Sequence, residues 1–262
     1  MFKLSILLAR QRSGTGALGI VLDQQPKVKY LGEVFHDQRL NEDVNFFNFM
    51  MKKVADSPSQ ALPSNRSQQL KDFFSFVQEI HPGKERIIID VKYRSLHHIN
   101  GFWHGPREMP TFIRLSRELG LGIIHLTRRN FIKTYVSGLL AEMNKVWHAT
   151  SAAEIKVNTI KVDTGRLLNY LNATRNEVEF VTGFLRNYSN VLHLEYEDMF
   201  DDRGFIKSEH EEKIAGFCGL SEFLRIAPPL IKQTSNQLQD VIENYQDVAG
   251  ILKDTIYSWM LE

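Results

Sequence analysis

The sequence predicts an α/β fold in which helices flank a central, mostly parallel sheet. Apolar runs of strand length recur along the chain, and segments with helical periodicity separate them. Runs such as RIIIDVKY (86–93) and GIIHLT (122–127) are rich in Ile, Leu and Val, as expected for strands that are covered on both faces. Strands that alternate with helices imply βαβ units, and these units pair their strands in parallel.

The individual elements follow from these two patterns in chain order. The first strand, KLSILLA, leads through a glycine-bearing turn into ALGIVL at helical spacing. A Pro- and Ser-rich stretch at 55–68 is expected to be a surface loop within the same domain, so that residues 1–262 form a single domain. Strands are expected at 3–9, 28–35, 86–93, 122–127 and 190–196. Helices are expected at 14–24, 42–55, 66–80, 110–119, 130–146, 163–187, 207–218 and 237–257.

Composition and charge exclude several classes of protein. The 262 residues are 43% hydrophobic and 24% charged, which suffices for one large core. With 32 basic and 31 acidic side chains, the net charge of +1 predicts neither nucleic-acid nor membrane binding. The single cysteine, Cys218, excludes an internal disulfide and a cysteine-rich metal site. The apolar run near the N-terminus is shorter than a signal-peptide core, and no run reaches the roughly 18 residues of a membrane span. We therefore expect a cytoplasmic protein without a membrane span.

The loop after the first strand has the composition of an anion-binding turn. It contains Arg12, Ser13, Gly14, Thr15 and Gly16, and a helix follows directly. Such a turn directs backbone N–H groups and the positive end of the helix dipole toward one point. A nucleoside-triphosphatase loop would end in Gly-Lys-Ser/Thr, with the hydroxyl on magnesium, and that pattern does not occur here. The loop therefore predicts an anion held by Arg12 and backbone donors without obligatory magnesium; a turn used only for packing is the alternative.

A second basic element follows the strand GIIHLT. Two adjacent arginines begin the segment RRNFIKTYVSGLLAEMNK (128–145), in which Asn130 can cap the following helix. Ser137 comes about two helical turns later, within reach of a phosphate that Arg129 would hold. Ligands of open α/β sheets bind at the carboxyl ends of strands. We therefore expect Arg129 and the first loop to face one crevice.

These two elements together resemble the sulfotransferase family that uses 3′-phosphoadenosine 5′-phosphosulfate (PAPS). In that family an RSGT-like loop holds the 5′-phosphosulfate, which matches the stretch Arg12 to Thr15. An Arg-Asn pair followed by a serine holds the 3′-phosphate, which matches Arg129, Asn130 and Ser137. The resemblance implies a P-loop-like three-layer fold, with PAPS bound by Arg12, Ser13, Gly14, Thr15, Gly16, Arg129 and Ser137.

Further segments extend the resemblance over most of the chain. YLGEVF (30–35) and VLHLEYEDMF (191–200) are similar to family segments, and IKQTSNQLQDVIENYQDV (231–248) looks like the end of the bacterial carbohydrate sulfotransferases that act on Nod factor and trehalose glycolipids. The RKGxxGxW loop of the cytosolic steroid and phenol enzymes is missing from the sequence. By this resemblance, Lys232 and Thr234 lie in a loop that folds over the nucleotide.

The sulfuryl-transfer chemistry needs a base for the acceptor proton and positive charge on the transferred group. Arg12 is the candidate for the leaving phosphate oxygen. Lys92, at the end of its apolar strand, can bridge the sulfuryl and leaving oxygens, with a snorkelling lysine as the alternative. Glu33 is the favoured base, since the bacterial relatives carry a glutamate in the corresponding place. His36 is the rival base, because the unperturbed histidine pKa suits the task.

Two histidines and an aromatic stretch complete the candidates. His97 and His98 can orient the acceptor, and they cannot easily share one metal ion because they are adjacent. Phe102, Trp103 and His104 can stack on a sugar face, although an aromatic packing cluster is the favoured interpretation of these three. No metal site is expected.

The sequence thus predicts an O-sulfotransferase that uses PAPS and acts on a hydroxyl of a carbohydrate or glycolipid. Two alternatives stay open. A P-loop nucleotide kinase or hydrolase would require a magnesium ligand set and a loop lysine. A non-catalytic nucleotide-binding member of the fold would keep the anion site without the base.

Overall fold

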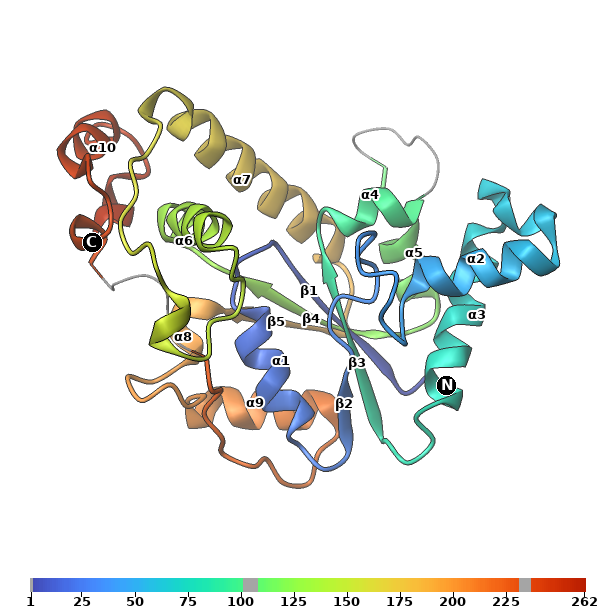
Figure 1. The fold of residues 1–262 in the computed structure, drawn as a ribbon. Coiled ribbons are helices and arrows are strands. Elements are labelled where there is room, and N and C mark those ends of the chain that lie inside the picture. Colours follow the sequence, from blue (N-terminus) through green and yellow to red (C-terminus); the bar gives the residue numbers. More distant parts are fainter. Residues whose placement is uncertain (1, 101–107, 231–236) are drawn as a thin grey trace.

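The computed structural model describes residues 2–100, 108–230 and 237–262, and it is built around a five-stranded parallel sheet (Figure 1). The strand order is β2-β3-β1-β4-β5, and all four pairings are parallel. The strands are β1 (Leu4–Ala9), β2 (Val28–Tyr30), β3 (Arg86–Lys92), β4 (Gly122–Thr127) and β5 (Val191–Glu195). The predicted α/β class with a central parallel sheet flanked by helices is confirmed.

Helices connect the strands and cover both faces of the sheet. The α-helices are α1 (Thr15–Asp23), α2 (Phe46–Asp56), α3 (Arg66–Glu79), α4 (Ser95–Asn100), α5 (Thr111–Glu118), α6 (Phe131–Asn144), α7 (Thr164–Leu185), α8 (Tyr196–Met199), α9 (Ser208–Cys218) and α10 (Tyr245–Leu252). Short 3-10 turns are η1 (Pro58–Ala61), η2 (Pro63–Asn65), η3 (Ala152–Glu154), η4 (Leu238–Asp240) and η5 (Ser258–Leu261).

The two faces of the sheet bury separate apolar clusters, because successive side chains of a strand point to opposite faces. On β1, Leu4, Ile6 and Leu8 pack toward α2, α3, α5 and α7. Leu7 and Ala9 pack toward α1 and α9, which lie together on the other side of the sheet in Figure 1. A third cluster joins α6 and α7 to α10 and η5 near the C-terminus. The central strands are therefore covered on both sides, as their apolar sequences predict.

Most predicted boundaries agree with the structure within two residues, but the second strand is shorter than predicted. It was expected at 28–35 and ends at Tyr30. Gly32 has a φ of 66°, a left-handed conformation that glycine adopts without strain and that turns the chain. Its carbonyl still accepts a hydrogen bond from Asp90 N at 2.9 Å. The turn therefore places Glu33 just beyond the end of the sheet, beside β3.

The last predicted helix, 237–257, is wrong as a continuous element. It is divided into η4, α10 and a following turn. The backbone between η4 and α10 pairs with another segment instead of with itself: Ile160 N donates to Val241 O at 2.8 Å, and Glu243 N donates to Ile160 O at 3.0 Å. The side-chain amide of Asn244 accepts a hydrogen bond from the backbone N–H of Val162 and donates one to its carbonyl oxygen. These long-range bonds replace the helical ones. Helices α4 and α8 were not predicted.

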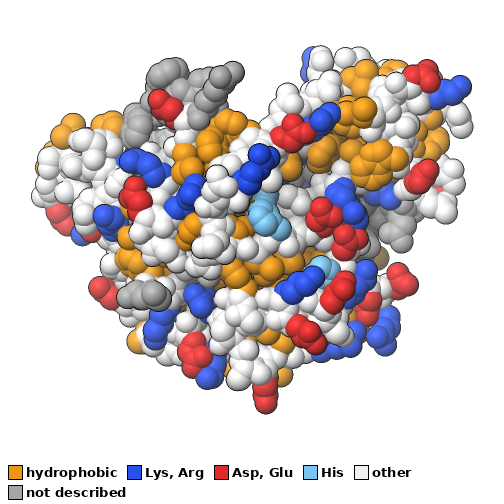
Figure 2. Space-filling model, turned by 180° about the vertical axis from the view of Figure 1, so that it is seen from behind, with side chains coloured by type: hydrophobic (Ala, Val, Ile, Leu, Met, Phe, Trp, Pro, Cys, Tyr) orange, Lys and Arg blue, Asp and Glu red, His pale blue; other side chains and the backbone are white. Residues whose placement is uncertain are grey.

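The surface shows charges of both signs. Figure 2 shows basic and acidic side chains interspersed over the face seen from behind, in keeping with the net charge of +1. Within the residues that the structure describes, no helix combines the length and apolar character that a bilayer span requires.

Candidate functional site

The loop between β1 and α1 is bent into a tight turn at the carboxyl edge of the sheet. Arg12 has a φ of 65° and Gly14 a φ of 91°, so two left-handed residues frame Ser13. A left-handed backbone is costly for arginine, and here Arg128 stabilises it by donating from Nη1 to the carbonyl oxygen of Arg12 at 3.1 Å. Helix α1 begins at Thr15, and no side chain caps its first turn. The first N–H groups of α1 therefore point toward the loop as an anion site requires.

Two aromatic rings lie directly against the glycines of this loop. A Cβ at Gly14 would overlap the ring of Tyr196, and a Cβ at Gly16 would overlap the imidazole of His148. These residues come from β5–α8 and from the segment after α6, which are distant in sequence. The two glycines therefore permit a close approach from both sides, and a larger residue would push the rings away.

Arg12 directs its side chain toward α6. Its Nη2 and Nε donate to Ser137 Oγ at 2.8 and 3.1 Å, and its Nη1 donates to the carbonyl of Trp147 at 2.7 Å. Burial and the nearby Arg128 lower the pKa of Arg12, and the guanidinium stays charged because its pKa starts so high. Three of the five N–H donors of an arginine are thus used within the protein.

A second cluster of charged groups lies where β3 ends beside α1. Lys92 Nζ contacts both carboxylate oxygens of Asp90 at 2.7 Å and also donates to Thr15 Oγ1. Both charged side chains are buried, with exposed fractions of 5% and 2%. Tyr30 donates its hydroxyl to Asp90 Oδ2 at 2.7 Å, and burial together with Asp90 raises the pKa of Tyr30 well above its usual value. This cluster connects β2 and β3 to the first residue of α1.

Glu33 lies beside this cluster, whereas His36 does not contact it in the described structure. Glu33 Oε1 is 3.7 Å from Lys92 Nζ, and the glutamate side chain is 22% exposed. The described contacts of His36 are local: its Nδ1 accepts from Gln38 N at 3.2 Å and lies 3.7 Å from Asp37 Oδ1. His98 Nδ1 is 3.9 Å from the other oxygen of the same aspartate. Of the two predicted bases, Glu33 is the one brought next to Lys92.

The arginine expected to hold a 3′-phosphate is paired with acidic groups. Arg129 lies 3.2 Å from Glu195 Oε2 and 2.8 Å from Asp198 Oδ1, and its side chain is 47% exposed. Glu197 accepts the backbone N–H groups of Arg129 and Asn130 at 3.0 and 2.9 Å. Ser137, in turn, is bonded to Arg12. The structure therefore brings Ser137 to the first loop and turns the Arg129 guanidinium toward β5 and α8.

The start of α6 agrees with the sequence prediction. Asn130 accepts a hydrogen bond from Lys133 N at 2.9 Å and so caps the helix as predicted. A wide pocket of about 420 Å³ opens beside this cap. It is lined by Arg129, Asn130, Lys133, Glu197, Trp259 and Glu262. Its charged lining contains both signs, so an anion bound there would also meet Glu197.

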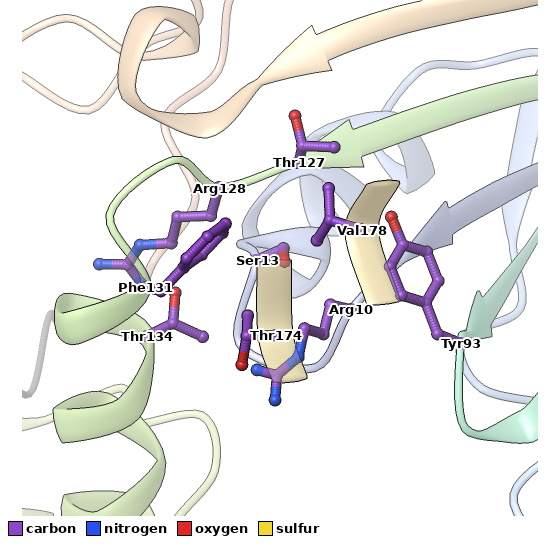
Figure 3. Close-up of a pocket in the computed structure, with 9 residues that line it drawn as sticks. All are labelled: Arg10, Ser13, Tyr93, Thr127, Arg128, Phe131, Thr134, Thr174 and Val178. Atoms are coloured by element: carbon purple, nitrogen blue, oxygen red, sulfur yellow. The ribbon is translucent and has the colours of Figure 1, made fainter. Parts of the chain in front are cut away.

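A small cavity lies behind the loop, between β4, α6 and α7 (Figure 3). Its volume of about 10 Å³ has room for roughly one water molecule. Figure 3 shows Ser13 and Arg10 on one side of this space and Thr134 on the other, with Thr174 contributed by α7. Arg10 is held by Glu177 Oε2 and by the hydroxyl of Tyr170, both at 2.8 Å. The cavity is too small for a nucleotide.

Sequence reasoning missed two residues of this site. Asp90 carried a signal, because it stands two positions before Lys92 in an apolar strand and therefore on the same face. His148 carried none, since no motif surrounds it. Its imidazole lies on Gly16, and burial together with the charges of Arg12, Lys92 and Arg39 lowers its pKa. His148 is therefore neutral at pH 7 and able to accept a proton or a hydrogen bond.

Several predicted residues lie outside the described part of the chain. These are Phe102, Trp103 and His104 in the first gap and Lys232 and Thr234 in the second. Across residues 2–100, 108–230 and 237–262, the His, Cys, Asp and Glu side chains form no group of three that could hold a metal ion.

Comparison with known proteins adds no assignment to this site. The chain matches no protein-family model. No curated protein matches it at a significant level. The function is therefore inferred from the geometry of the site and from the sequence motifs.

Proposed function

We propose that this chain is a PAPS-dependent O-sulfotransferase with a P-loop-like fold, acting on a hydroxyl of a carbohydrate or glycolipid. The observation that carries the proposal is the convergence of three kinds of group on the start of α1. Lys92 donates to Thr15, the first residue of the helix, and Glu33 lies 3.7 Å from the same ammonium. Arg12, three residues after the end of β1, adds a second cation near the start of the helix. A phosphosulfate requires cations and backbone donors there, and an acceptor hydroxyl requires a carboxylate beside them.

The sheet topology supports the P-loop-like part of this proposal. Strand β1 is central, with β3 and β4 as neighbours. Lys92 is the last residue of β3, and the loops after β1 and β4 supply Arg12 and Arg129. Ligands of parallel α/β sheets bind outside the carboxyl ends of such strands. The arrangement therefore gathers the three cations at one edge.

The phosphosulfate end of PAPS fits the residues present. The uncapped first turn of α1 offers N–H donors, Ser13 and Thr15 add hydroxyls, and Arg12 adds a guanidinium. Gly14 and Gly16 let the rings of Tyr196 and His148 pack directly against the loop. PAPS would supply the sulfuryl group on a phosphate leaving group.

The 3′-phosphate end requires an exchange of partners. Arg129 would release Glu195 and Asp198 and turn toward the phosphate. Such exposed ion pairs contribute only about 0–1 kcal/mol, so the exchange costs little. Ser137, on the α6 helix that follows Arg129, already accepts from Arg12.

In the proposed reaction the acceptor oxygen forms a bond to sulfur while the bond between sulfur and the phosphate oxygen breaks. Glu33 takes the hydroxyl proton, and the phosphate oxygen leaves as an anion facing Arg12 and Lys92. General-base help of this kind contributes about 10²–10⁴-fold, and fixed cations stabilise the charge that develops on the leaving oxygen. Glu33→Gln is therefore expected to lower the turnover of PAPS by about this factor without changing nucleotide affinity.

One experiment distinguishes the proposed sulfotransferase from the two alternatives, a nucleotide kinase or hydrolase and a non-catalytic binding module. Thermal stability is measured with 3′-phosphoadenosine 5′-phosphate (PAP), with ADP, and with ATP plus magnesium. A ligand at 100 times its dissociation constant stabilises by about 2.7 kcal/mol, which raises the Tm by a few degrees. The variants are Arg129→Ala and, as a matched control on the exposed surface of α7, Arg166→Ala.

The proposal predicts that PAP stabilises the wild type and the control variant but not Arg129→Ala. Equal or greater stabilisation by ATP plus magnesium overturns it in favour of a kinase or hydrolase. Binding of PAP without any turnover of PAPS, in wild type and in Glu33→Gln alike, assigns the non-catalytic role.

A further inference from the structure

The ammonium of Lys92 lies among oxygen atoms in the way that a bound metal ion does. Two oxygens of Asp90 lie 2.7 Å from it, Thr15 Oγ1 is also in hydrogen-bond contact, and Glu33 Oε1 is 3.7 Å away. The lysine side chain is 5% exposed. A buried cation is thus surrounded by two carboxylates and a hydroxyl, all of them ligand types that Mg²⁺ prefers.

The elements that supply these oxygens are those that hold magnesium in P-loop enzymes. There the metal is bound by the Ser or Thr at the start of the helix after the loop and by an aspartate at the end of a neighbouring strand. Here Thr15 is the first residue of α1. Asp90 lies on β3, which pairs with β1 so that Asp90 is opposite Leu7 and Lys92 opposite Ala9.

We propose that the Lys92 ammonium is the resident cation of this loop and stands where P-loop enzymes hold magnesium. Removing the lysine side chain then uncovers a divalent-cation site formed by Thr15, Asp90 and Glu33. This inference rests on the P-loop-like fold that the proposed function includes, and it does not depend on PAPS.

An ammonium in this position determines which way the hydrogen bond between Lys92 and Thr15 runs. A lysine ammonium has three N–H donors and no acceptor, so Thr15 Oγ1 must accept from it. The hydroxyl proton of Thr15 is then left to donate to an anion held in the loop. A metal ion bound to the same oxygen would orient the hydroxyl in the same way.

Tyr30 holds the carboxylate that faces the ammonium. Its hydroxyl donates to Asp90 Oδ2 at 2.7 Å, and its ring lies against Gly19, where a Cβ would overlap it. Asp90 Oδ2 is therefore held by Tyr30 as well as by Lys92. With the lysine gone, this carboxylate stays aimed at the same point.

The size of the site indicates which ions would enter it. Oxygens lie about 2.0–2.1 Å from Mg²⁺ and 2.3–2.6 Å from Ca²⁺, whereas those of Asp90 are 2.7 Å from Nζ. A metal ion would draw the carboxylate inward and complete its shell with water. Mn²⁺ binds the same ligand types and is visible by electron paramagnetic resonance, so Mn²⁺ is the probe.

The experiment titrates Mn²⁺ into the wild type, Lys92→Ala and the double variant Lys92→Ala/Asp90→Asn, without nucleotide. We expect Lys92→Ala to bind Mn²⁺ at least tenfold more tightly than the wild type. Asp90→Asn in the same background should remove the gain, and excess Mg²⁺ should compete. Equal affinity of wild type and Lys92→Ala, or a gain that survives Asp90→Asn, overturns the proposal.

A second comparison covers the case in which Lys92→Ala does not fold. Wild type and the isosteric Asp90→Asn are titrated with Mn²⁺, and the proposal expects equal weak binding, because the ammonium already fills the position. Tighter binding by the wild type than by Asp90→Asn overturns it. Since PAP is absent from both titrations, a failure of the sulfotransferase assignment would appear only in the nucleotide test.

Discussion

The two halves of the candidate site are built differently. Where β1 and β3 end, Asp90, Lys92 and Thr15 form a buried cluster whose members are all hydrogen-bonded to one another or to Tyr30. Where β4 and β5 end, Arg129 pairs with carboxylates on the surface, and its side chain and that of Asp198 are about half exposed. The buried half is fixed by its own contacts, whereas the exposed half would have to exchange partners to take the proposed 3′-phosphate.

The position of the strands in the sheet explains this difference. Strand β3 lies between β2 and β1, while β5 is an edge strand. Charges buried at the end of an inner strand are held by fixed partners, because an unpaired buried charge is costly. Charges at the edge remain in water and exchange partners easily. The buried half is therefore held in one arrangement, and the exposed half can exchange ion-pair partners.

The largest expected effect is a difference in the free energy of unfolding between a variant in the buried half and a variant in the exposed half. Asp90→Ala leaves the Lys92 ammonium buried without its carboxylate and should lower the free energy of unfolding by about 3–5 kcal/mol. Asp198→Ala, which breaks the exposed pair with Arg129, should cost less than about 1 kcal/mol. Urea denaturation of both variants measures the difference. Similar losses in the two variants would contradict the contrast between buried and exposed halves.

Acid should lower the free energy of unfolding through a buried histidine in β4. Burial and the neighbouring His193 lower the pKa of His125 from 6.5 to about 3; its Nε2 meets the hydroxyl of Tyr93 at 2.5 Å, and its Nδ1 lies 3.2 Å from Nδ1 of His193. The folded state therefore keeps His125 neutral while the unfolded state binds a proton below pH 6.5. The stability from this residue is complete above pH 6.5 and falls toward pH 3, with about 3 kcal/mol lost by pH 4.

The measurement compares urea denaturation of wild type and His125→Gln at pH 7 and pH 4. The variant lacks the titrating ring, so its loss of stability between the two pH values should be smaller by about 3 kcal/mol. An equal pH dependence in both proteins would show that His125 titrates normally in the folded state.

A glycine pair tests how tightly the first loop is packed. Gly14 and Gly32 both have positive φ values, 91° and 66°, but only at Gly14 would a Cβ meet another side chain, the ring of Tyr196; at Gly32 nothing described lies within 4 Å. Both alanine variants share the cost of the left-handed backbone. Gly14→Ala should lose about 2 kcal/mol more from overpacking, as thermal or urea denaturation will measure. Equal losses would mean that Tyr196 moves aside freely.

The smallest expected effect concerns the exchange of partners at Arg129. Asp198→Asn removes one competing carboxylate and should tighten PAP binding by a few-fold, since exposed pairs contribute about 0–1 kcal/mol. Isothermal titration at low and high salt measures this, and the gain should shrink at high salt because surface charges are screened. Asp202→Asn is the control for the same change in net charge nearby. An equal gain in PAP affinity in Asp202→Asn would show that the effect comes from the change in net charge and not from the ion pair with Arg129.

The elements of the fold were largely predictable from local sequence. The apolar runs at 86–93 and 122–127 became β3 and β4 because a run of Ile and Val buries well only inside a covered sheet. The early end of β2 and the division of the last helix were not predicted. The first follows from the left-handed backbone of Gly32, and the second from hydrogen bonds between Ile160 and residues 241–243, which lie far from it in the sequence.

For the candidate site, the places of the residues in the fold could be predicted from the sequence, but their pairing only in part. Strand and glycine patterns in the sequence predict the loop from Arg12 to Gly16 and the position of Lys92 at the end of its strand. The hydrogen-bond partners of these residues do not follow from such patterns, because Lys92 meets Thr15 across 77 residues and Arg12 meets Ser137 across 125. His148 reaches Gly16 from a segment without any motif.

By itself the sequence determined the alternation of strands and helices, the anion-binding composition of the first loop and the cap of α6 by Asn130. These depend on backbone preferences and hydrogen bonds among near neighbours, which a short window of residues contains. Only the tertiary structure decided which distant groups meet: Lys92 meets Thr15 across 77 residues, and Arg129 meets Asp198 across 69. Such pairings are set by where the packed sheet and helices bring distant side chains together and by how much water remains around them, and no local pattern encodes either.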